Sequence, residues 1–159
     1  MTGAAPVPPV QRAVRALTAV SIVGIALELI VERHWGAVAR LIPWFALLAS
    51  GVALTMLARR PTAATVRAVR IVAMAVLLAG GIGVGLHITE NYSAGPLDQR
   101  SSAVWETMSE PSRWWAAFTK SVGPAPTFAP AALAEVALLL LISTIGGGAI
   151  ARGAVLPPR

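Results

Sequence analysis

Long apolar runs separated by short polar links dominate this chain. Four of these runs are long enough to cross a hydrocarbon core about 30 Å thick, which takes about 20 helical residues. They predict membrane-spanning helices at residues 13–31, 41–58, 71–90 and 131–150. Because backbone polar groups inside a bilayer must be paired within the segment, we predict an all-α fold, a four-transmembrane-helix bundle.

The polar segments predict where the chain leaves the bundle. Residues 1–12 are rich in Pro and Ala, have no apolar periodicity and are expected to form a mobile tail. The membrane domain then covers residues 13–152, and residues 153–159 form a C-terminal tail. The first apolar run is too long for the core of a signal peptide and contains Glu28, so we do not expect it to be cleaved.

The longest link, residues 93–129, carries a helical pattern of its own. Its apolar residues recur near the 3.6-residue repeat, with charged residues such as Glu110 and Arg113 between them. The apolar positions are Val104, Trp105, Met108, Trp115 and Phe118. We therefore predict one or two short amphipathic helices, the second with Pro111 in its first turn. So many tryptophans favour a position along the membrane interface, although packing against the bundle is an alternative.

Composition and charge support the same class of protein. The chain is 56% hydrophobic and 13% charged, and its mean hydropathy is +0.71, far from the values of a soluble domain. Its net charge of +6 does not indicate a nucleic-acid partner, because the arginines flank apolar runs and do not cluster with base-stacking aromatics. The absence of cysteine excludes disulfides and thiolate metal sites.

The arginines also predict the orientation. With four spans both termini lie on one side, which holds eight basic residues: Arg12, Arg15, Arg59, Arg60, Arg67, Arg70, Arg152 and Arg159. Five lie on the other side: Arg33, Arg40, Arg100, Arg113 and Lys120. The positive-inside rule then places the termini in the cytoplasm and the long loop outside. Alanine is abundant, and arginine is used in place of lysine. This composition is typical of a GC-rich bacterial genome, so we predict that the protein lies in a bacterial plasma membrane.

Polar residues inside the predicted spans form the candidate site. Glu28, His87 and Glu135 each lie three or four residues inside the outer end of a different span. At 1.5 Å per residue they are expected at one depth, roughly 5 to 8 Å below the surface. Glu32 and Asn91 follow one turn above Glu28 and His87 on the same helix faces. Ionisable groups at this depth normally face the bundle interior, so we predict an outward-facing polar pocket.

Carboxylate and imidazole groups together suit a divalent metal such as Zn, Mn or Fe, a proton relay or a polar headgroup. The alternative is structural, because a Glu–His pair near the surface can simply tie two helices together. No other cofactor is indicated: the chain has no phosphate-binding loop, no HExxH and no nucleophile elbow. His34 falls outside its predicted span, which argues against a haem with two histidine ligands.

The third span is rich in glycine. Gly81 and Gly85 stand in GxxxG spacing, which allows close approach of a neighbouring helix. Ordinary packing within the chain and a dedicated dimer face are both open interpretations.

Several short motifs resemble a group of small four-span bacterial integral membrane proteins of uncharacterised function. They are Leu27-Glu28-Leu29, Glu32-Arg33-His34-Trp35, Leu41-Ile42-Pro43, His87-Ile88-Thr89-Glu90-Asn91-Tyr92 and Ala129-Pro130. The resemblance implies a four-helix membrane protein with an external loop, and no activity. Members of that group often carry further acidic residues after the Asn-aromatic pair, where this chain has Ser93-Ala94-Gly95. That departure weakens the metal hypothesis.

Three functions remain open at this stage. The first is a non-catalytic integral membrane protein that contacts a membrane-protein partner, or a second copy of itself, through the Gly-rich span and the tryptophan-rich loop. The second is a small protein that binds a metal ion or polar ligand with Glu28, His87 and Glu135. The third is a membrane enzyme that uses the same groups, ranked last because no nucleophile or reaction-specific motif accompanies them.

Overall fold

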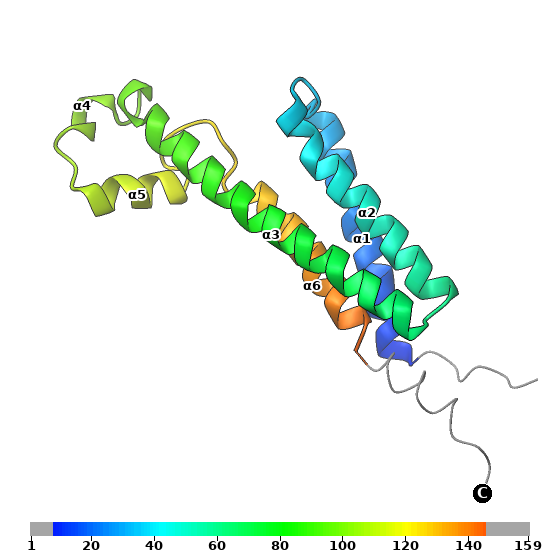
Figure 1. Ribbon diagram of the computed structural model, residues 1–159. Coiled ribbons are helices and arrows are strands. Elements are labelled where there is room, and N and C mark those ends of the chain that lie inside the picture. Colours follow the sequence, from blue (N-terminus) through cyan, green and yellow to red (C-terminus); the bar gives the residue numbers. More distant parts are fainter. Residues whose placement is uncertain (1–7, 146–159) are drawn as a thin grey trace, which may run out of the picture. The chain divides into compact units, whose positions relative to one another are not determined.

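The structure is a computed structural model that describes residues 8–145, and this range is helical without any strand. The helices follow one another as Figure 1 shows. The α-helices are α1 (Pro9–Val31), α2 (Ile42–Arg59), α3 (Ala63–Ala94), α4 (Ser102–Trp105), α5 (Glu110–Phe118) and α6 (Ala129–Ser143). Two short 3₁₀ helices, η1 (Val38–Leu41) and η2 (Gly95–Leu97), precede α2 and follow α3.

Three helical segments are long and apolar enough to cross a membrane. They are the 23 residues of Pro9–Val31, the 22 residues of Val38–Arg59 and the 35 residues of Ala63–Leu97. α6 is also apolar but has 15 residues in the described part of the chain. The predicted end of the fourth span at residues 146–152, and the C-terminal tail at 153–159, lie outside the described residues.

Local capping explains why two helices begin earlier than predicted. α1 begins at Pro9 and not at Ala13, because proline is pre-organised for the first turn of a helix. Four residues assigned to the N-terminal tail are therefore helical. α3 begins at Ala63 and not at residue 71, and the hydroxyl of Thr62 accepts a hydrogen bond of 3.1 Å from the amide of Thr65. This is the contact an N-terminal cap makes.

The described chain divides into two compact units. The first contains residues up to Leu78 together with those from Leu133 onward, and the second contains Ala79–Ala132. In the first unit α2, α6 and the beginning of α3 surround an apolar core, against which Ile22 and Ile25 of α1 pack. Its most buried members are Ala53, Leu57, Val69, Ala73, Val136, Ala137 and Leu140.

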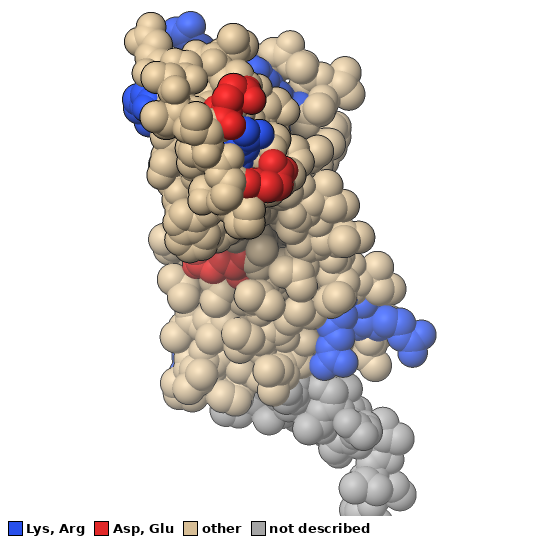
Figure 2. Space-filling view, turned by 90° about the vertical axis from the view of Figure 1, so that its left-hand side faces the viewer, with Lys and Arg blue, Asp and Glu red and all other residues tan. Residues whose placement is uncertain are grey.

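The outer faces of the helices in the first unit are apolar as well. Val20 of α1 is 68% exposed, Leu48 of α2 66% and Ile71 of α3 64%. Figure 2 shows a face of the molecule on which uncharged residues cover most of the surface and charged side chains gather in a few groups. Exposed apolar surface is unfavourable in water by about 25 cal/mol per Å², whereas hydrocarbon accepts it. These faces suit a lipid environment.

The second unit has a smaller core of its own. It contains the end of α3, then α4, α5 and the segment that returns to the start of α6. Trp105, Ala117 and Val122 are buried at its centre, and Ile88 and Tyr92 of α3 pack against them. The link that the sequence places outside the membrane is therefore a folded segment built on the end of α3.

Candidate functional site

The five predicted site residues fall into both units. His87 and Asn91 lie on α3 in the second unit, whereas Glu28, Glu32 and Glu135 belong to the first. The surroundings of each residue are described within its own unit. The convergence of Glu28, His87 and Glu135 in one pocket stays a prediction.

Asn91 is the central polar residue of the second unit. Its side chain is fully buried, and its Nδ2 donates to the carbonyl oxygens of Ala117 (3.2 Å) and Ala125 (2.9 Å) and to Thr127 Oγ1 (3.1 Å). Its Oδ1 accepts a hydrogen bond of 2.8 Å from the amide of Ala125. The amide group thus ties α3 to the end of α5 and to the return segment. The predicted place of Asn91 in a pocket with Glu28, His87 and Glu135 stays a prediction.

Gly123 allows the return segment to reach Asn91. Its φ of +80° lies in the left-handed region that residues with a side chain rarely adopt. A β-carbon at this position would lie 2.4 Å from Asn91 Oδ1 and 2.6 Å from Asn91 Cα. Both the backbone angle and the available space therefore require glycine here.

Asp98 also holds the backbone at Gly123 in place. Its Oδ2 accepts hydrogen bonds from the amide of Gly123 (2.8 Å) and from a guanidinium nitrogen of Arg100 (2.7 Å), and its Oδ1 accepts from Arg100 Nε and from the Arg100 amide. The Arg100 side chain, then the amides of Arg100 and Gly123, hold the pKa of Asp98 well below its usual range. The sequence prediction missed this residue. The Asp-Gln-Arg order was the available signal, because Asp often bonds to the amide two residues on.

Glu110 joins α5 to the end of α3. Its carboxylate accepts hydrogen bonds from the hydroxyl of Tyr92 at 2.8 and 3.0 Å and from Trp114 Nε1 at 3.0 Å. The rings of Tyr92 and Trp114 stack with centroids 4.3 Å apart. Arg113 lies over the Trp105 ring at 5.7 Å and donates to the Trp105 carbonyl oxygen. These contacts join α3, α4 and α5 within the second unit.

Among residues 8–145, His87 makes one polar contact, through Nδ1, which lies 2.9 Å from the carbonyl oxygen of Pro126. Because a carbonyl oxygen only accepts hydrogen bonds, Nδ1 carries the proton, and Nε2 of the neutral ring keeps a lone pair. No residue of the described chain is bonded to that nitrogen. Histidines that bind metals usually donate their other N–H to a carbonyl or carboxylate in this way.

The carboxylates of the first unit are exposed. Glu32 follows the last turn of α1, and its amide donates to the carbonyl oxygen of Glu28. Glu135 of α6 accepts a hydrogen bond of 3.4 Å from Ser21, which lies two turns before Glu28 on the same face of α1. Two turns span about 10 Å, so Glu135 is matched to the level of Ser21 and not to that of Glu28.

Within residues 8–145 no group of three or more histidine, aspartate or glutamate side chains is placed to hold a metal ion. The metal site predicted at Glu28, His87, Glu135, Glu32 and Asn91 stays a prediction.

The glycines of α3 behave differently from one another. A β-carbon added to Gly83 would lie 2.7 Å from Cβ of Pro130, so this glycine permits the close approach of the residues that begin α6. At Gly81 and Gly85, which form the GxxxG pair, no packing atom of the described second unit lies within 4 Å of that position. Ile82 and Leu86 beside them are 55% and 63% exposed. The GxxxG face is thus unused within the second unit.

The second unit also exposes an aromatic cluster. Trp115 and Phe118 lie with ring centroids 5.6 Å apart, and Phe118 and Phe128 lie 5.3 Å apart. Trp115 is 66% exposed and Phe128 57%. Rings of this kind are common where a protein meets the membrane interface.

Comparison of the chain with protein-family models, with curated proteins and with solved structures found no match. The function is therefore inferred from the arrangement of the chain's own residues.

Proposed function

We propose that the protein is a multi-pass integral membrane protein of a bacterial plasma membrane, with four spans and both termini in the cytoplasm. The three long apolar helices support membrane insertion, and the apolar sequence from residue 131 to 150 supplies the fourth span. The basic residues support the orientation, in which the second unit carries the external loop. A reporter fused to the C-terminus should be active in the cytoplasm, and activity only outside it would overturn this topology.

Its function is non-catalytic: it acts as an accessory subunit that binds a helix of a partner membrane protein through the Gly81–Gly85 face. The observation that carries this proposal is the open space over both glycines within the described second unit, flanked by exposed Ile82 and Leu86. Helices associate in lipid where small residues let their backbones approach closely, and this face has that composition. The rigid network around Asn91 and Glu110 is suited to presenting the external aromatic residues beside such a partner.

Photo-crosslinking in native membranes tests the proposal. A photoreactive residue at Ile82 should give a discrete protein adduct, and Gly85→Ile should abolish that adduct because its side chain fills the open face. The matched control places the photoreactive residue at Val23 of α1, which is 58% exposed. An adduct of twice the chain mass would identify a second copy as the partner. Crosslinking to lipid alone, equal at Ile82 and Val23, would refute the proposal.

The second candidate function is binding of a metal ion or polar ligand at His87. The hydrogen bond of His87 to Pro126 favours it, because this bond fixes the ring tautomer that leaves Nε2 able to bind a ligand. Elemental analysis of the purified protein, and its melting temperature with and without Zn²⁺ or Mn²⁺, test the candidate. A bound metal, or a rise in melting temperature that His87→Ala abolishes, would support it. Metal-free protein with unchanged melting would exclude a metal site.

A further inference from the structure

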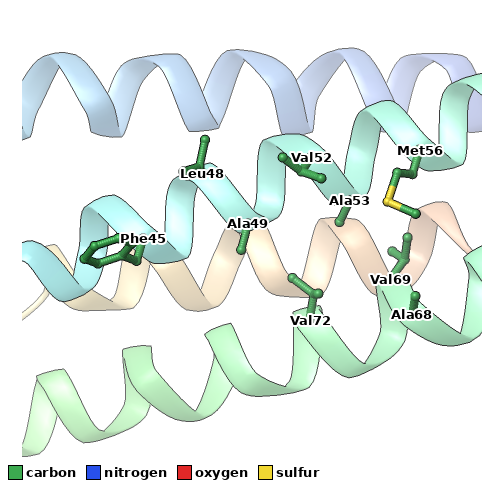
Figure 3. A pocket seen from close by; sticks show the side chains of 9 residues that line it. All are labelled: Phe45, Leu48, Ala49, Val52, Ala53, Met56, Ala68, Val69 and Val72. Atoms are coloured by element: carbon green, nitrogen blue, oxygen red, sulfur yellow. The ribbon is translucent and has the colours of Figure 1, made fainter.

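An apolar groove opens between α2 and α3 on the surface of the first unit. Its volume is about 490 Å³, and no residue that lines it has a polar side chain. Figure 3 shows six residues of α2 and three of α3 along it. They are Phe45, Leu48, Ala49, Val52, Ala53, Met56, Ala68, Val69 and Val72.

Small residues create the groove and large ones form its rim. Ala49, Ala53 and Ala68 leave space between the two helices, whereas Phe45 and Leu48 are each 66% exposed at its side. An apolar channel of this kind is poorly suited to water, which would find no hydrogen-bond partner on its walls. Hydrocarbon is the matching occupant.

The length of the groove matches one leaflet of a bilayer. On α2 it runs from Phe45 to Met56, eleven residues apart, which is about 16 Å at 1.5 Å per residue. This is close to half of a hydrocarbon core about 30 Å thick. A groove for a transmembrane helix would be expected to continue across both leaflets.

Two arginines lie beyond one end of the groove. Arg59 is the last residue of α2 and follows Met56 by three residues, so the helical repeat places it about one turn further along the wall that α2 provides. Arg60 is the next residue, directly after the end of the helix. Both are exposed, and neither forms an ion pair with a carboxylate in the described part of the chain. The groove thus ends next to two cationic groups that are available to an anion.

From this arrangement we infer that the first unit binds an anionic phospholipid of the surrounding bilayer. One acyl chain lies in the groove between α2 and α3, and the phosphate lies beside Arg59 and Arg60. Basic residues at the membrane surface attract anionic headgroups, and the groove adds contacts for the chain below. The inference rests on the membrane insertion proposed above, but it does not depend on a partner at the Gly81–Gly85 face.

Competition between lipids tests the inference. The purified full chain would be placed in detergent with equal amounts of phosphatidylglycerol and phosphatidylcholine, and retained lipid measured by native mass spectrometry. We expect phosphatidylglycerol to be retained in preference, and Arg59→Gln with Arg60→Gln to reduce its retention by about tenfold. The matched control is Arg12→Gln with Arg67→Gln, which removes the same charge from other faces of α1 and α3 and should leave retention unchanged.

A second variant tests the groove separately. Ala49→Leu fills the space between α2 and α3 and should lower retention of phosphatidylglycerol, whereas Ala16→Leu on the exposed surface of α1 should not. This variant keeps the inference testable if the double arginine variant does not fold. Equal retention of both lipids, or no effect of Ala49→Leu, would overturn the inference. Release of lipid together with formation of a dimer would also overturn it, because a second copy would then occupy the groove.

Discussion

Gly123 lies so close to Asn91 that a β-carbon at position 123 would be 2.4 Å from the Asn91 side-chain oxygen. Asn91 is fully buried at this contact, and its amide group is bonded to three residues, one at the end of α5 and two in the return segment. Asn91 and Gly123 therefore hold the return segment between α5 and α6 against α3, together with the bond between His87 and Pro126. Substitutions at these two positions should have the largest effects in this unit.

Gly123→Ala should destabilise the second unit by about 2 to 5 kcal/mol. A side chain at a φ of +80° costs about 1 to 2 kcal/mol, and overpacking against Asn91 adds about 1 to 3. Hydrogen–deuterium exchange of residues 95–128 would report the change as faster exchange. Gly24→Ala is the control, since no atom lies within 4 Å of its β-carbon position. Equal exchange in the two variants would contradict the proposed packing.

Asn91→Ala should also loosen the return segment. It removes the bond partner of the Ala125 amide and of the carbonyl oxygens of Ala117 and Ala125, all in a buried site. Leaving buried polar groups unpaired costs about 1 to 3 kcal/mol each, so we expect a loss of at least about 2 kcal/mol. Thermal unfolding in detergent would measure it. Ser93→Ala, on the exposed side of α3, should have little effect, and a similar loss there would argue against a special role for Asn91.

The helices were predictable from the sequence because about 20 successive apolar residues leave few alternatives to a spanning helix. Their starts at Pro9 and Ala63 were not, since they depend on local features, a proline in the first turn and a bond to the Thr62 hydroxyl, that hydropathy does not report. The polar site was harder still. The depth of a residue along a helix follows from counting residues. The direction in which its side chain points, and the residues that it contacts, cannot be counted in this way. Asn91 was singled out as a polar residue, yet its partners lie 26 to 36 residues away in the sequence.

The stability of the second unit should depend on pH through Asp98. The bonds from Arg100 and Gly123 hold its pKa well below the value of about 4 that it has in an unfolded chain. A carboxyl group with a lowered pKa stabilises the fold above its unfolded pKa, and that contribution is lost as pH falls below about 4 toward the folded value. Limited proteolysis of the 95–128 segment should therefore accelerate in acid. The Asp98→Asn variant should be cleaved faster than the unaltered protein at neutral pH, and its cleavage should accelerate less in acid. If the variant's cleavage depends on pH as in the unaltered protein, Asp98 does not have this role.

His87→Ala separates a structural role from a binding role. If the ring only ties α3 to Pro126, the loss of one hydrogen bond should lower stability by about 1 kcal/mol and change nothing else. If Nε2 binds a ligand, the variant should also lose any metal-dependent or ligand-dependent rise in melting temperature. His87→Gln, which can still donate to the Pro126 carbonyl oxygen, serves as the comparison. If His87→Gln restores the melting temperature but not its rise with ligand, then His87 has both the structural role and the binding role.

Gly83 and Gly85 should respond in opposite ways to the same substitution. A larger residue at position 83 meets Pro130 within 2.7 Å, so Gly83→Leu should separate α3 from the start of α6 and destabilise the second unit by about 1 to 3 kcal/mol. Gly85→Leu meets no atom of the unit and should be neutral or slightly stabilising, because leucine favours helices over glycine by up to about 1 kcal/mol. Melting temperatures of the two variants in detergent measure this difference. If Gly85→Leu lowers stability in membranes but not in dilute detergent, the loss belongs to a contact between chains, as the proposed partner face requires.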